Sequence, residues 1–154
     1  MTQQLQLEGG ALYEVHGRIV RILTSRDAGL EEWQLEILRL LASHAGHENA
    51  ITAAKICERL GLGEGENGRR KVTETIEELR RRFRLPIGGS RRPPHGYFLV
   101  VTAEDQQIAL ADLRKQAIAM FQLAGILGGE AFTAELHGQI RAALDGEQEG
   151  GRAA

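Results

Sequence analysis

Apolar residues recur at intervals of three and four along most of this chain, which is the spacing of amphipathic helices. In residues 30–44 the repeating apolar positions are Leu30, Trp33, Ile37, Leu40 and Leu41. In residues 69–83 they are Val72, Ile76, Leu79 and Phe83. A shorter run, residues 53–60, follows Thr52, whose side chain is suited to capping a helix. The pattern therefore predicts three helices between residues 30 and 83.

A hairpin is expected after the third helix, because Pro86 prevents the helix from continuing and extends the residue before it. Residues 87–89 and 96–101 predict its two arms, and the tip between them reads Ser-Arg-Arg-Pro-Pro-His over residues 90–95. The prolines stiffen this tip and remove its need for ladder hydrogen bonds. The short segment from Ala50 to Thr52 could add a strand to the hairpin.

Two more helices are expected at residues 103–127 and 131–144, with Gly128 and Gly129 between them. The first carries a seam in the a and d positions of a heptad, with Phe121 beside it. The seam residues are Leu110, Leu113, Ala117, Met120, Ala124 and Leu127. This seam either packs on the preceding helices or joins two copies of the chain, and we favour a homodimer.

The first part of the chain, residues 1–29, is ambiguous. Residues 12–23 fit an alternating strand pattern and a helical pattern equally well, and their β-branched residues and Gly17 favour strands. The alternative is a helix that swaps between subunits. At the other end, residues 145–154 are polar and rich in glycine, which predicts a disordered tail. The expected organisation is thus residues 1–29, 30–102, 103–144 and 145–154.

Charge is concentrated in one stretch of the sequence. The whole chain has a net charge of -2, but residues 69–95 contain nine Arg or Lys and three Glu, which gives +6 and leaves -8 for the remainder. Because the basic residues fall on a helix and on a separate turn, they indicate one localised attractive surface. The alternative interpretation is a solvated cationic helix.

The composition predicts an ordinary globular protein. Its 154 residues are 42% hydrophobic and 26% charged. The first ten residues lack the pattern of a signal peptide, and no uncharged apolar run reaches the roughly 18 residues of a membrane span. The single cysteine, Cys57, excludes an internal disulfide and fits a cytoplasmic location. We therefore expect no membrane partner.

The order helix, short strand, helix, loop, helix, hairpin resembles the winged helix-turn-helix superfamily from Leu30 to Thr102. The fragment LPIGGSRRPPHGYFLV is similar to the wing of DNA-binding proteins in phages and bacterial mobile elements. The resemblance implies a mainly α fold with a three-helix core, a small β wing and a C-terminal helical extension. It makes residues 69–83 the recognition helix and residues 85–101 the wing. The implied function is sequence-specific transcriptional regulation or an accessory role in phage or plasmid replication.

A helix fits the major groove of double-stranded DNA and usually reads it with its N-terminal half. Arg70 and Thr73 are therefore the first candidates for base contacts, and Glu74 could accept from a cytosine amino group. Phosphate or minor-groove contacts are expected from the remaining cations and from the tip. These candidates are Arg69, Lys71, Arg81, Arg91, Arg92 and His95. For the arginines at residues 80–84, compensation of the helix dipole is an equal alternative.

Catalysis, metals and cofactors are not expected. The glycines at positions 63, 65 and 68 match a dinucleotide-binding pattern, but an amphipathic helix precedes them where that pattern requires a strand. His44, His47 and Cys57 lack an evident fourth ligand for zinc. No small-molecule substrate is evident. The rival hypothesis is a winged-helix module that docks on another protein without binding DNA.

Overall fold

The computed structural model describes residues 10–25 and 27–150, and the side chains within them from residue 14 to residue 146. This described part of the chain is mainly helical, with 70% helix and one small two-stranded antiparallel sheet. Its chain divides between Asp112 and Leu113 into two compact units, which are described separately. The division lies ten residues beyond the expected boundary at Thr102, because the first turns of the last helix belong to the first unit.

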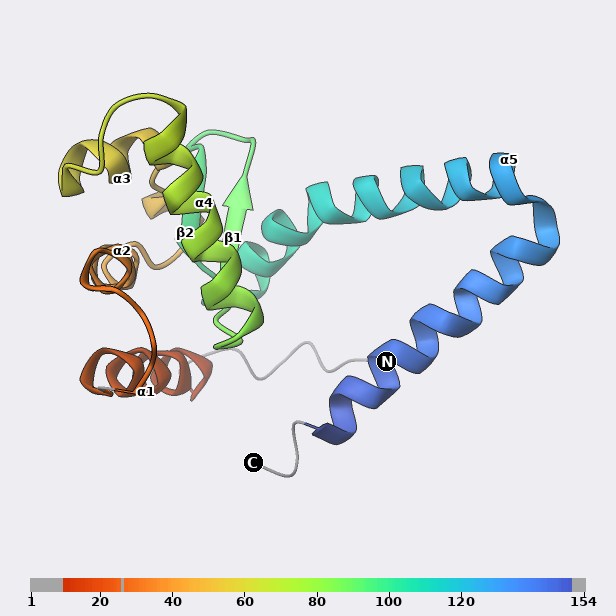
Figure 1. Cartoon of the computed structure of the whole chain (residues 1–154), viewed down its shortest axis with the longest axis horizontal. Coiled ribbons are helices and arrows are strands. Elements are labelled where there is room, and N and C mark those ends of the chain that lie inside the picture. Colours follow the sequence, from red (N-terminus) through yellow and green to blue (C-terminus); the bar gives the residue numbers. More distant parts are fainter. Residues whose placement is uncertain (1–9, 26, 151–154) are drawn as a thin grey trace. The chain divides into compact units, whose positions relative to one another are not determined.

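The first unit contains four helices, a short 3-10 turn and a hairpin (Figure 1). In chain order these are α1 (Gly10–Thr24), α2 (Glu32–Ala42), η1 (His47–Asn49), α3 (Ala53–Leu60), α4 (Glu66–Arg81), β1 (Ile87–Ser90) and β2 (Gly96–Leu99). Helix α5 (Ala103–Gly150) starts in this unit and continues into the second.

The core of this unit is built from the predicted apolar stripes. Ile37 of α2, Ile56 of α3 and the α4 residues Val72, Ile76 and Leu79 have no exposed surface. Phe98 and Leu99 of β2 are equally buried. The helical spacing of three and four thus places one apolar face of each helix against the others and against the hairpin.

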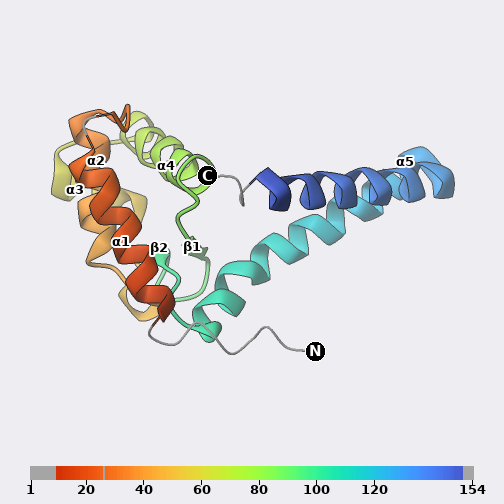
Figure 2. The same cartoon turned by 90° about the horizontal axis from the view of Figure 1, so that it is seen from below.

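The first element contradicts the expectation of strands. Residues 10–24 form a helix, and Val15, Ile19 and Ile22 are its buried side chains. Their spacing of four and three gives a single apolar face, whereas a strand that alternates through Val15 and Ile19 would have placed Ile22 on the opposite side. Because α1 packs beside α2 (Figure 2), burial on one side decides between two patterns that the sequence left open.

The hairpin forms where it was predicted, but its first strand extends one residue further than expected and its second strand ends two residues earlier. Ile87 pairs with Leu99 and Ser90 with Gly96, which leaves residues 91–95 as the tip. Ile51 adds one antiparallel bridge to Tyr97, so the expected pairing of residues 50–52 with the hairpin is confirmed. Gly96 makes this approach possible, because its φ is +120° and a Cβ there would lie 2.2 Å from the carbonyl oxygen of Ile51.

Two helix starts test the expected caps. The Thr52 hydroxyl accepts from the backbone N–H of Lys55 at 3.2 Å, which confirms the cap of α3. Helix α4 begins three residues earlier than expected, at Glu66, with Gly65 at its N-cap, so Asn67 lies inside the helix. Gly68 in its first turn is buried, and a Cβ there would lie 2.4 Å from the Gly63 carbonyl oxygen. The loop therefore closes tightly against the start of α4.

The second unit contains the rest of α5. Its helix is interrupted at Gly129, where φ is 72° and ψ is -175°, so the predicted break between two helical segments is confirmed. The segments on either side contact one another through the rings of Phe121 and His137, whose centroids are 5.1 Å apart. The helix continues to Gly150 where a disordered tail was expected from residue 145, and residues 151–154 lie outside the described part.

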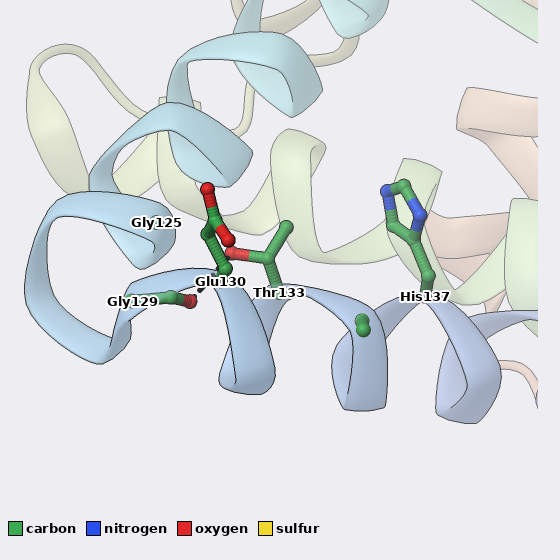
Figure 3. A pocket seen from close by; sticks show the side chains of 6 residues that line it. Gly125, Gly129, Glu130, Thr133 and His137 are labelled. Carbon is green, nitrogen blue, oxygen red and sulfur yellow. Dashed lines mark hydrogen bonds between the residues drawn. The ribbon is translucent and has the colours of Figure 1, made fainter.

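A small hollow lies in the bend of α5, lined by Gly125, Gly129, Glu130, Thr133, Ala134 and His137 (Figure 3). The Thr133 hydroxyl donates to the Gly129 carbonyl oxygen at 3.0 Å, which satisfies a backbone acceptor at the interruption. The bend is thus stabilised by local contacts within the second unit.

Candidate nucleic-acid interface

Arg80 fixes the hairpin beside α4. Its Nε donates to the carbonyl oxygen of Ile87 at 2.7 Å, and its guanidinium lies 5.8 Å from the ring centroid of Tyr97. The side chain is therefore in contact with both strands. Both views show α4 next to β1 and β2 (Figures 1 and 2).

The same side of α4 carries Arg69 and Thr73. They precede Arg80 by eleven and seven residues, which returns each to within about 20° of Arg80 around the helix axis. Both side chains are exposed, and the Thr73 hydroxyl donates to the Arg69 carbonyl oxygen at 3.0 Å. Two of the residues expected to contact DNA are thus brought to the flank of α4 that adjoins the hairpin.

Arg70 and Glu74 form an ion pair with each other. The Arg70 Nε lies 2.6 Å from a Glu74 carboxylate oxygen, and the hydrogen bond raises the pKa of Arg70 above its usual range. Their side chains are 76% and 61% exposed, so the pair sits in solvent on the outer face of α4. Each of these residues was expected to contact a base on its own. In the free protein, however, the guanidinium of Arg70 and the carboxylate of Glu74 bind each other.

Two further acidic residues of α4, Glu77 and Glu78, are also paired with arginines. Glu77 accepts from Arg80 at 2.7 Å and from Arg81 at 3.3 Å, and these bonds, the one from Arg80 foremost, hold its pKa below the usual value. Glu78 accepts from Arg82 at 3.1 Å. Residues 66–81 contain five basic and four acidic side chains, so α4 itself carries only +1. Arg81 remains 85% exposed despite its partner.

Lys71 lies on the other flank of α4. Its ammonium is 5.8 Å from the ring centroid of Trp33 in α2, a cation–π contact. Glu78 on the same flank accepts from the Gln34 amide of α2 at 3.0 Å. Lys71 is therefore separated from Arg69 around the helix, although the sequence suggested that both would contact phosphates in the same way.

The tip of the hairpin presents Arg91, Arg92 and His95, all of which are exposed. Ser90 shapes the turn, because its hydroxyl accepts from the Arg92 backbone N–H at 3.0 Å. Arg91 is 3.9 Å from the Asp112 carboxylate, a distance at the limit of an ion pair. Within the described part of the chain Arg92 has no carboxylate partner. The tip thus retains more available positive charge than α4.

Asp105 joins the hairpin to the elements around it. Its carboxylate accepts from the backbone N–H groups of His47, Val101 and Thr102 at 2.8, 3.1 and 3.0 Å. Burial raises the pKa of this carboxyl, but these hydrogen bonds outweigh burial, and the net pKa lies below the usual value. Along the sequence Asp105 is simply one of two acids in the first turn of α5. Its spacing of three from Thr102, which caps the same helix at 3.0 Å, was the available signal.

The three residues considered as zinc ligands, His44, His47 and Cys57, have other partners or are buried. A ring nitrogen of His44 lies 2.6 Å from the Asn49 carbonyl oxygen, and one of His47 lies 3.1 Å from the Ser90 hydroxyl. Cys57 is buried. Among the described residues no group of three or more His, Cys, Asp or Glu side chains is placed to hold a metal ion.

No family model, curated protein or solved structure matches this chain. A functional proposal therefore depends on the arrangement of α4 and the hairpin.

Proposed function

We propose that this chain is a winged helix-turn-helix DNA-binding protein, with α4 as the recognition helix and β1–β2 as the wing. The observation that carries the proposal is the contact of Arg80 with both strands. It places the hairpin on the flank of α4 that also bears Arg69 and Thr73. Two separate elements then contribute positive charge to one surface, which is what a double-stranded polyanion requires.

In this proposal the N-terminal half of α4 enters the major groove. Arg69 and Thr73 lie at the edge nearest the wing, where they can reach phosphates or base edges. Arg70 is held in place by Glu74, and its guanidinium becomes available when a phosphate or guanine competes for it. The tip arginines, Arg91 and Arg92, contact the backbone or a narrow minor groove. The biological role would be transcriptional regulation or an accessory function in replication of a phage or plasmid.

The test is a fluorescence anisotropy titration with a labelled random-sequence duplex at several salt concentrations. Affinity should fall steeply between about 50 and 200 mM salt, because binding releases counterions. Replacing both Arg91 and Arg92 with Ala should reduce the slope of log affinity against log salt by about 1.8, since each phosphate contact contributes about 0.9.

The matched control is Arg21→Ala combined with Arg39→Ala, which removes the same charge from α1 and α2. That variant should retain the wild-type slope, because its arginines lie on helices outside the proposed surface. If both double variants lost the same amount of slope, the loss would come from net charge alone. That result would argue against DNA contacts by the tip of the hairpin.

A protein-docking module is the second candidate, and the pairing of arginines on α4 favours it. Four of the five basic residues of α4 already have a carboxylate or an aromatic partner within the protein. Such a surface suits a partner with mixed charge and exposed apolar groups better than it suits DNA. Absence of duplex binding even at the lowest salt would support this second function and reject the first.

A further inference from the structure

The second unit exposes more apolar surface than a solvated helix should. The exposed fractions of Met120, Ile126 and Leu127 are 70, 80 and 79%. Leu113 and Leu123, on the same segment of α5, are more than half exposed as well. Together with Ile118, which is 52% exposed, these residues occupy about 220° of the helix circumference at about 100° per residue, and an apolar face this wide is normally covered.

A bilayer is the first covering to consider, because α5 is long and apolar enough to cross one by length and composition. The uncharged run, however, extends only from Gln116 to Gly129, with Lys115 before it and Glu130 after it. These 14 residues would measure about 21 Å, against a hydrocarbon core of about 30 Å. Any 18-residue window of α5 with two or fewer charges also includes Gly129, where the helix is interrupted. The segment is better suited to burial in protein.

The apolar seam is arranged symmetrically about Gln122. Ala117 and Leu127 are five residues before and after this point, and Met120 and Ala124 are two residues before and after it. If two copies of the helix lie antiparallel with this point as their centre, the two large seam residues of residues 117–127 each face a small one. Met120 then meets Ala124 of the second copy, and Leu127 meets Ala117. Alternation of large and small side chains is what lets two helices approach closely.

The charges that bound this segment have the same symmetry. Arg114 lies eight residues before Gln122 and Glu130 lies eight residues after it. In the antiparallel arrangement Arg114 and Lys115 of one copy lie near the point where the helix of the other copy is interrupted at Gly129, which is followed by Glu130. A parallel arrangement would instead bring Arg114 of both copies together, and like charges would oppose it.

We propose that the 113–128 segment of α5 pairs antiparallel with the same segment of a second copy of this chain, centred on Gln122. A hollow of about 470 Å³ lies along the seam, lined by Met120, Leu123, Ala124, Leu127, Gly128 and Phe132, and it receives apolar side chains of the second copy. The partner is a protein surface, so the proposal stands apart from nucleic-acid binding and is tested without DNA.

Site-specific disulfides test the register in the full-length chain. Ala117→Cys alone should give no covalent dimer on mild oxidation, because the two copies of residue 117 would lie about 15 Å apart along the axis, beyond disulfide reach. Ala117→Cys combined with Leu127→Cys should give a covalent dimer, since these positions face each other. The wild-type chain, whose Cys57 is buried, is the control for background oxidation.

Swapping the charges of Arg114 and Glu130 by mutation tests the same antiparallel arrangement without introducing cysteines. In analytical ultracentrifugation, Arg114→Glu should weaken the dimer about tenfold, because two symmetric ion pairs become repulsive. Combining Arg114→Glu with Glu130→Arg should restore the wild-type affinity. Ready cross-linking of Ala117→Cys alone would reject the antiparallel register. A wild-type chain that sediments as a 16.9 kDa monomer, or that floats with phospholipid vesicles through α5, would reject the proposal altogether.

Discussion

At the scale of single residues, Asp105 connects parts of the first unit that are far apart in the sequence. Through three backbone N–H groups it holds the start of η1, the end of the hairpin and the first turn of α5. The hairpin is therefore anchored at its base by one buried carboxylate, while Arg80 holds its side against α4. A change at Asp105 should alter both the stability of the unit and the position of the hairpin.

We expect Asp105→Asn to destabilise the first unit by about 1–3 kcal/mol at neutral pH. An amide would present a donor to at least one N–H group that now has a carboxylate acceptor. Thermal or urea unfolding followed by circular dichroism measures the difference.

The lowered pKa of Asp105 also predicts how the stability difference between wild type and Asp105→Asn changes with pH. Because the folded pKa of Asp105 is lowered, its stabilising contribution is fully present above the unfolded pKa of about 3.9. That contribution is lost as the pH falls through the lower folded pKa. The gap between wild type and Asp105→Asn should therefore be constant from neutral pH to about pH 5 and narrow below about pH 4. If the stability difference instead widened on acidification, the folded pKa of Asp105 would have to be raised above the unfolded value and not lowered.

At the scale of elements, α4 combines a well-packed inner face with an outer face whose charges largely neutralise one another. Its inner stripe was predictable, because Val72, Ile76 and Leu79 repeat with helical spacing and are fully buried. Its outer pairing was only partly predictable. Arg70 and Glu74 stand four apart, so their pairing follows from spacing. The contact of Lys71 with Trp33 depends on where α2 packs, which no local pattern reveals.

Glu74→Gln tests whether that pairing restrains DNA binding. The substitution removes one negative charge and releases Arg70, so affinity for a duplex should rise by about threefold to tenfold. Stability should fall by less than about 0.5 kcal/mol, since an exposed pair at this spacing contributes little. Duplex titration by anisotropy and thermal unfolding provide the two readings.

Glu36→Gln on α2 is the matched control for this change. Glu36 also bonds an arginine on its own helix, Arg39, so the variant removes the same charge from a surface outside the proposed interface. A weaker affinity for Glu74→Gln than for this control would indicate that the Glu74 carboxylate itself contacts the DNA.

At the scale of the whole molecule, the order and type of most elements followed from the sequence, and one element did not. The hairpin was predictable because Pro86 and the glycines at 88, 89 and 96 leave few alternatives, and the break at Gly129 followed from a glycine pair. Helix α1 was not, because its apolar residues fit both periods and only packing against α2 selects the helix. The link from Asp105 to His47 was also hidden, since 58 residues separate its partners.

For the candidate site, too, local sequence predicted some features, and contacts between distant residues decided the others. Sequence identified the two basic clusters, but whether they share a surface depended on the contact of Arg80 with both strands. That contact joins residues in separate elements, and the sequence contained no signal for it. The proposal of DNA binding therefore gains its support from tertiary arrangement more than from charge.

The most direct test of this arrangement is a titration of duplex DNA into isotope-labelled protein, followed by amide chemical-shift changes residue by residue. We expect the largest changes to fall together on residues 69–73 of α4 and on the tip residues 91–95, at the same DNA concentration. Changes confined to one of these two segments, or located on α1 or on α5 beyond Asp112, would show that α4 and the hairpin do not form one DNA-binding surface.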